Sequence, residues 1–68
     1  MTADQIDFCL ANGGGYITCN GDNGLRLTEW KSKAAGVVWL YCKRYGDFFE
    51  ADIKDLSDSF WHTHQACA

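Results

Sequence analysis

Apolar and polar residues alternate along two stretches of the chain, and a turn interrupts each stretch. The first reads Tyr-Ile-Thr-Cys over residues 16–19 and resumes over residues 25–30 after an Asn-Gly-rich break. The second covers residues 37–42 and 48–53, with Gly46 between them. Alternating side chains point to opposite faces of a strand, and Asn and Gly tolerate the positive φ angles of tight turns. The pattern therefore predicts two β-hairpins.

The two ends of the chain carry weaker patterns. Residues 5–10 have apolar side chains at alternate positions, which predicts a short opening strand. These side chains are Ile6, Phe8 and Leu10. We expect a short helix or an irregular segment over residues 55–61, followed by an extended strand that carries Cys67. Together the elements predict a single all-β domain over residues 1–68, a small antiparallel five-stranded barrel or sandwich with at most one short helix near its C-terminus.

Four cysteines are many for a chain of 68 residues. A domain this short buries too little apolar surface to be stable on its core alone, and disulfides are the common remedy. Cys19 and Cys42 fall in phase with the apolar side of their strands, whereas Cys9 is out of phase with its neighbours. Of the three possible pairings, this favours Cys19 with Cys42 and Cys9 with Cys67. Because disulfides form in oxidising compartments, we expect a secreted, extracellular protein whose signal peptide has been removed and replaced by Met1.

Strand periodicity divides the side chains of the predicted strands between two faces. The predicted core face carries Ile17, Cys19, Leu25, Leu27, Val38, Leu40, Cys42, Phe49, Ala51 and Ile53. The second face carries Tyr16, Thr18, Arg26, Thr28, Trp30, Val37, Trp39, Tyr41, Lys43, Phe48, Glu50 and Asp52. This second face holds more aromatic residues than an ordinary solvated surface.

Two explanations of the aromatic second face stay open. In the first, the sheet curls and the segment around Phe60 and Trp61 covers the rings. In the second, part of the face is exposed and binds a partner, because Trp, Tyr and Arg are common at the centres of protein interfaces. We expect a combination, in which Trp39 and Tyr41 are covered and a rim stays available. The predicted partner-binding residues are Tyr16, Arg26, Trp30 and Phe48.

The charge and the spacing of polar residues argue against several classes of function. The net charge is −3 and the basic residues gather in the middle of the chain, whereas a nucleic-acid-binding domain is normally strongly basic, so no nucleic-acid partner is expected. No apolar run reaches the roughly 20 residues of a membrane span. Structural zinc sites use closely spaced cysteines, which this chain lacks. The one alternative, His62 and His64 with Cys67, is more typical of surface histidines, so no metal is expected.

No catalytic site is predicted. The cysteines are assigned to disulfides, and no serine lies in a constrained turn beside a histidine. Glu50 and Asp52 share one strand face, but a solvated acidic edge is more usual than a catalytic carboxylate pair. A ribonuclease-like combination of His64, Glu50 and Arg44 would need a deeper pocket than so small a domain provides. We therefore expect that the protein is not an enzyme and uses no cofactor.

In its size and cysteine spacing the chain resembles the small secreted cysteine-containing proteins that microbes, fungi especially, release toward hosts or competitors. The resemblance implies a non-enzymatic effector or toxin that docks, as a monomer, on a host or competitor protein. The segment over residues 38–42, followed by Gly46, is also similar to the strand-and-turn unit of cyanovirin-type lectins.

Two alternative functions follow from the same residues. The similarity to lectins implies a carbohydrate-binding module, and the side chains available to stack on sugar rings are Trp30, Tyr16 and Trp39. A small inhibitor of an extracellular enzyme is the other alternative, with the loop over residues 20–24 or 45–47 as its wedge.

Overall fold

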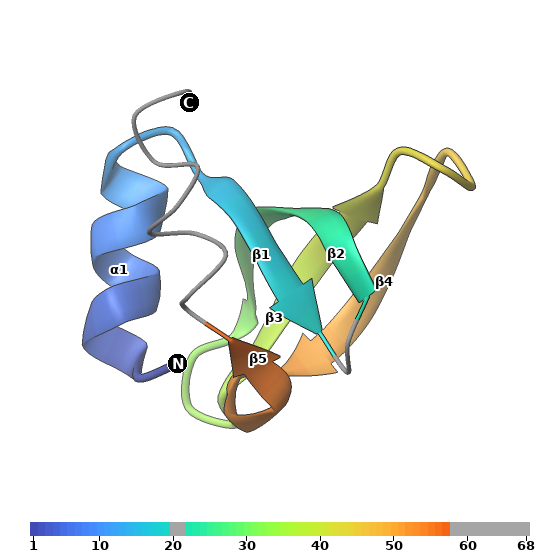
Figure 1. The fold of residues 1–68 in the computed structure, drawn as a ribbon. Coiled ribbons are helices and arrows are strands. Elements are labelled where there is room, and N and C mark those ends of the chain that lie inside the picture. The colour runs from blue at the N-terminus through green and yellow to red at the C-terminus, as the bar shows by residue number, and fades with distance from the viewer. Residues whose placement is uncertain (20–21, 58–68) are drawn as a thin grey trace.

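A computed structural model describes residues 1–19 and 22–57 of the chain (Figure 1). The elements run in the order α1 (Ala3–Ala11), β1 (Gly15–Cys19), β2 (Asp22–Ser32), β3 (Val37–Cys42), β4 (Asp47–Asp52), the 3-10 helix η1 (Ile53–Asp55) and β5 (Leu56–Ser57). The strands form one antiparallel sheet in the order β4-β3-β2-β1-β5. Because β4 and β5 lie at opposite edges and do not pair with each other, the described part of the sheet is open and not a closed barrel.

The mostly antiparallel β character of the chain is confirmed, and so are both predicted hairpins. The hairpin β1–β2 places Ile17 opposite Leu25, and the hairpin β3–β4 places Leu40 opposite Phe49. Most of the predicted core face is buried, namely Ile17, Cys19, Leu25, Leu27, Val38, Leu40 and Cys42. Phe49 shares this face but is 38% exposed, because β4 is an edge strand.

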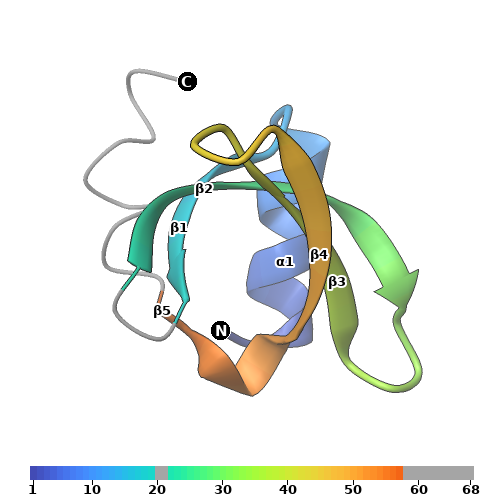
Figure 2. The ribbon, with the colours of Figure 1, turned by 90° about the vertical axis from the view of Figure 1, so that its right-hand side faces the viewer.

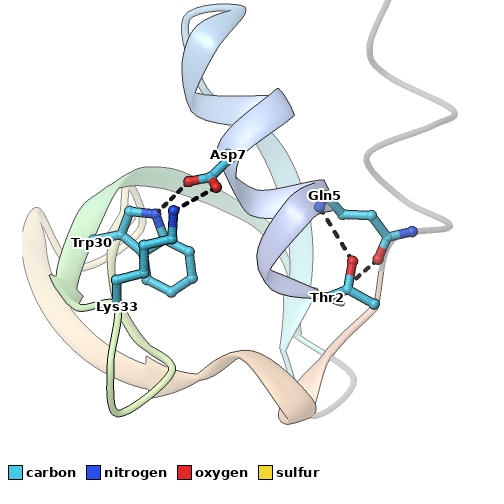
Figure 3. A network of polar contacts seen from close by, with 5 residues as sticks. All are labelled: Thr2, Gln5, Asp7, Trp30 and Lys33. Carbon is cyan, nitrogen blue, oxygen red and sulfur yellow. Dashed lines mark hydrogen bonds and ion pairs between the residues drawn. The ribbon is translucent and has the colours of Figure 1, made fainter.

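The predicted opening strand over residues 5–10 is wrong, because these residues belong to α1. The helix begins with a capping box, in which the Gln5 amide donates to the Thr2 hydroxyl at 3.2 Å and the Thr2 amide donates to Gln5 Oε1 at 2.8 Å (Figure 3). These bonds satisfy backbone donors that have no partner within the helix. Ile6 and Cys9, three residues apart, share one side of α1 and are fully buried.

The helix α1 lies against the core face of the sheet, and Figure 2 shows it behind the curved strands. One buried cluster joins the two layers, with Ile6 and Cys9 from α1 meeting the strand residues of the core face and Leu56 of β5. The amino group of Met1 donates to the carbonyls of Ile53 and Leu56, both at 2.9 Å. The start of α1 is thereby attached to the end of the sheet that carries η1 and β5.

Strand β2 bends along its length (Figure 2). Its register with β3 shifts between Leu27 and Glu29 and again between Trp30 and Ser32, and each shift places an extra residue in β2. At the first shift the Thr28 hydroxyl donates to the Trp39 carbonyl at 2.9 Å. An extra residue reverses the faces of the residues after it, so strict alternation along β2 stops at this point.

The predicted Cys19–Cys42 disulfide is wrong, since no disulfide joins any two of Cys9, Cys19 and Cys42. Strand order explains this. β2 lies between the two strands concerned, because Leu25 is opposite both Ile17 of β1 and Cys42 of β3. Two strand spacings are about 10 Å, and Cα atoms more than about 7 Å apart cannot be bridged without backbone movement. All three cysteines are buried and fill the core instead.

The remaining predictions for the C-terminal segment lie outside the described residues. They are the Cys9–Cys67 disulfide, the final strand, the covering of the aromatic face by Phe60 and Trp61, and the pair His62 and His64. Within the described part of the predicted segment over residues 55–61, the 3-10 helix η1 ends at Asp55 and is followed by β5.

A polar network connects α1 to β2 (Figure 3). Trp30 Nε1 donates to Asp7 Oδ1 at 3.0 Å, and Lys33 Nζ donates to Asp7 Oδ2 at 2.7 Å. The hydrogen bond from Lys33, and then that from Trp30, lowers the pKa of Asp7 below its ordinary value. The charged Asp7 carboxylate thus adds a polar contact between α1 and the sheet to the buried cluster that joins the two layers.

We expect this network to make the stability of the chain fall in acid. A carboxylate whose folded-state pKa lies below its unfolded value of 3.8 stabilises the fold above pH 3.8, and loses that contribution as the pH falls through the folded-state pKa. Asp7→Asn removes the contribution at every pH. Its urea midpoint should lie below that of the wild type at neutral pH and meet it well below pH 3.8. A difference that stays constant with pH would show that Asp7 acts through packing alone.

Candidate binding face

A row of side chains crosses four strands on the face of the sheet that points away from α1. Tyr16 of β1 lies opposite Arg26 of β2, Arg26 lies opposite Tyr41 of β3, and Tyr41 lies opposite Phe48 of β4. Directly opposite residues in antiparallel strands point to the same side, with Cβ atoms about 5 Å apart. The four side chains therefore form one continuous strip, which we call the outer row.

Much of the outer row is exposed. Phe48 is 53% exposed and Tyr16 is 37% exposed. Tyr41 is half-buried, and its ring meets the Phe48 ring edge-on with the centroids 4.9 Å apart. The exposed Arg26 donates from Nη2 to the carbonyl of Gly13 at 3.2 Å, which holds its guanidinium beside the turn before β1. The outer row thus combines exposed aromatic rings with an exposed guanidinium.

Two cavities lie along this face. The first has a volume of about 250 Å³ and is lined by Tyr16, Gly24, Arg26, Tyr41 and Lys43. The second has a volume of about 200 Å³ and is lined by Glu29, Trp39 and Phe48. Pockets for small-molecule ligands usually measure about 300–1,000 Å³. Both volumes lie below this range.

Trp39 shares the exposed face but is partly covered. Lys31 Nζ lies 5.1 Å from the centroid of the Trp39 ring and also pairs with the carboxylate of Glu50. The register places Glu29 and Glu50 on the two sides of Trp39. The long side chain of Lys31, which belongs to the same sheet, thus covers part of the Trp39 ring.

The structure brings together three of the predicted partner-binding residues, Tyr16, Arg26 and Phe48. Trp30 is not with them. It packs against the buried core, and its indole donates to Asp7 of α1. Strict alternation placed Trp30 on the face of Arg26, and the extra residue at Thr28 moves it to the other face.

Tyr41 was missed as a candidate site residue. It was expected to be covered in the middle of the sheet, yet it lines the first cavity and links Arg26 to Phe48. Alternation along β3 predicted the face of Tyr41 correctly, since Tyr41 lies two residues after Trp39 and shares its face. Its availability depends on the open sheet edge beyond it, which alternation does not report.

Among residues 1–19 and 22–57, no cluster of three or more His, Cys, Asp or Glu side chains is placed to hold a metal ion. In the same part of the chain, the α-helix has nine residues and is too short to cross a bilayer, which takes about 20.

Comparisons with protein families, with curated proteins and with solved structures give no match to this chain.

Proposed function

We propose that this chain is a small non-enzymatic binding protein that docks on a partner protein through the outer row. The supporting observation is the register of three aromatic residues and one arginine on four adjacent strands, on the face that α1 leaves open. Aromatic residues and Arg are enriched where interfaces bury most of their energy, because they combine a large apolar area with directed polar groups. The sheet holds these side chains in place before binding, which reduces the entropy lost on docking.

The lining of the first cavity favours binding over catalysis. Its described residues contribute two phenol rings, a guanidinium and an ammonium group, and no carboxylate, imidazole or thiol. A general base or nucleophile at neutral pH is usually drawn from the missing groups. The cavity is suited to recognising a charged side chain.

A carbohydrate partner is less well supported by the same face. Of the side chains predicted to stack on sugar rings, Trp30 lies toward α1 and Trp39 lies beneath Lys31. Tyr16 alone keeps the predicted position. The inhibitor hypothesis, with the loop over residues 20–24 or 45–47 as a wedge, stays a prediction.

Effector-like or toxin-like action outside the producing cell extends the proposal and depends on export. The export prediction was based on disulfides, and its Cys19–Cys42 bond is wrong. Export is tested directly by comparing the amounts of the protein in culture medium and in cells. Accumulation in the medium supports the extension, and retention in the cells contradicts it. The docking proposal itself is tested separately.

We expect Phe48→Ala to weaken binding to the partner protein by about tenfold or more, since truncation of an aromatic anchor in an interface commonly costs over 1 kcal/mol. Phe8→Ala is the matched control. Phe8 is also 53% exposed, but it lies on α1, so its loss should change the affinity less than about twofold. The partner is isolated with the wild-type protein, and its affinity for both variants is measured by calorimetry. Equal affinities of wild type and Phe48→Ala, with the fold intact by circular dichroism, would exclude the outer row as the docking surface.

A further inference from the structure

The basic residues of the chain fall into two groups. Three of them are neutralised within the fold, as Lys31 pairs with Glu50, Lys33 with Asp7 and Lys54 with Asp52. The other three make no ion pair with a described residue. They are Arg26, Lys43 and Arg44. Among the described side chains, three of the six basic residues therefore have no carboxylate partner.

Two of these cations converge on the first cavity. Arg26 and Lys43 line it together with the rings of Tyr16 and Tyr41. The bond from Arg26 Nη2 to the Gly13 carbonyl orients the guanidinium and leaves its other N–H groups available. A planar guanidinium matches a carboxylate with two parallel hydrogen bonds, and a nearby ammonium adds a third.

From this arrangement we infer that the first cavity binds the carboxylate of an acidic side chain, and that the partner of the outer row is an acidic protein segment. The inference rests on the proposed function and names the chemistry of the partner. The cavity's volume of about 250 Å³ is sufficient for one Asp or Glu side chain. Phe48, at the far end of the row, then contacts an apolar residue of the same segment.

A protein segment fits this face better than a nucleic acid. Glu29 lies beside Trp39 on the same face and makes no ion pair with a described residue, so its charge repels a phosphate backbone. The rings of Tyr41 and Phe48 meet at 63°, so they do not present a flat pair on which successive bases could stack. An acidic peptide needs a positive contact at one end only, and the face provides that arrangement.

The test uses two synthetic peptides, Glu-Phe-Glu-Phe-Glu and its counterpart Gln-Phe-Gln-Phe-Gln, added to the isotope-labelled full chain and followed by NMR. We expect the glutamate peptide to bind about tenfold tighter, to shift the amide signals of Tyr16, Gly24, Tyr41 and Lys43, and to lose affinity as salt rises. Equal binding of the two peptides, or shifts confined to α1, would overturn the inference. Tighter binding of a thymidine oligonucleotide than of the glutamate peptide would overturn it in favour of nucleic acid.

Charge variants make the test specific to the cavity. Lys43→Gln should weaken binding of the glutamate peptide by about fivefold or more, whereas Lys54→Gln, with the same change of net charge in η1, should leave it unchanged. Glu29→Gln should strengthen binding, since it removes a negative charge from the same face. Equal effects of the two lysine variants would show that net charge alone acts, and would overturn the inference.

Failure of this inference can be told apart from failure of the proposed function. If Phe48→Ala abolishes binding of the natural partner and Lys43→Gln does not, the outer row is the docking surface and the preference for an acidic segment is wrong. If both variants keep the partner while remaining folded, both proposals are wrong.

Discussion

Gly14→Ala should leave the chain largely unfolded at room temperature, whereas Gly13→Ala should leave it folded. Both glycines have positive φ, +86° at Gly13 and +80° at Gly14, so alanine at either position carries the cost of the left-handed conformation, about 1–2 kcal/mol. At Gly14 an added Cβ would also lie 2.5 Å from the backbone carbonyl oxygen of Leu27. At Gly13 it would meet nothing within 4 Å.

The clash at Gly14 is expensive because the chain has little freedom to relax there. Gly15 is paired with Leu27 in the β1–β2 ladder, so moving the Leu27 carbonyl disturbs the first pairing of the sheet. The left-handed conformation costs about 1–2 kcal/mol and the backbone clash about 3 kcal/mol or more, so the total loss reaches at least the net stability of about 5 kcal/mol that is typical of a small domain. The turn also positions the Gly13 carbonyl that holds Arg26, so the binding face should be lost together with the fold.

Urea unfolding followed by circular dichroism measures both glycine variants. The expected result is a normal transition for Gly13→Ala at a lower midpoint, and little or no folded baseline for Gly14→Ala. Equal midpoints would mean that the β1–β2 pairing relaxes around the new methyl group, and that the close approach at Gly14 is not a constraint.

Cys19→Ala and Cys42→Ala should have additive effects on stability, and the double variant should lose about 2–3 kcal/mol. Each buried thiol contributes roughly 1–1.5 kcal/mol through packing. The two residues lie on β1 and β3 with β2 between them, and substitutions at separated sites usually add to within about 0.5 kcal/mol.

A disulfide between the same residues would give a different result. Either single variant would break the cross-link and lose about 3.5 kcal/mol from loop closure, and the second substitution would then cost little more. A double-mutant cycle from urea unfolding separates the two cases. Strong coupling between Cys19 and Cys42 would contradict the strand order β4-β3-β2-β1-β5 as well as the absence of the bond.

The strands were predictable from the sequence because each has one buried and one exposed face. Alternation then reports both the strand and its orientation, as it did for Ile17 and Leu40 in the core and for Tyr16 and Phe48 outside. Of the Asn-Gly pairs, Asn12-Gly13 precedes β1 as a turn, whereas Asn23-Gly24 belongs to β2 itself.

The helix was not predicted, because a short apolar run can satisfy two periodicities at once. Ile6, Phe8 and Leu10 alternate like a strand, while Ile6 and Cys9 are spaced like a helix. The capping box formed by Thr2 and Gln5 is visible in the sequence as the pattern Thr-x-x-Gln, and it would have decided in favour of the helix.

The location of Trp30 and the missing disulfide could not be predicted from local pattern. Trp30 changes face because of the extra residue at Thr28, and a bulge leaves the composition of a strand unchanged. Cys19 and Cys42 lie on the same face, as predicted. Knowing the face of two residues does not give the number of strands between them, and here β2 separates the two cysteines. Strand order removed the predicted cross-link and the bulge removed Trp30 from the predicted site, and both are properties of the assembled sheet.

The central claim is that a partner protein covers the outer row and leaves α1 exposed. Hydroxyl-radical footprinting of the complex tests this directly, because the oxidation of each aromatic ring follows its exposure. The expected result is protection of Tyr16, Tyr41 and Phe48, with Phe8 oxidised at the same rate in the free and the bound protein. Protection of Phe8 with unchanged oxidation of Phe48 would place the partner on the helix and contradict the claim.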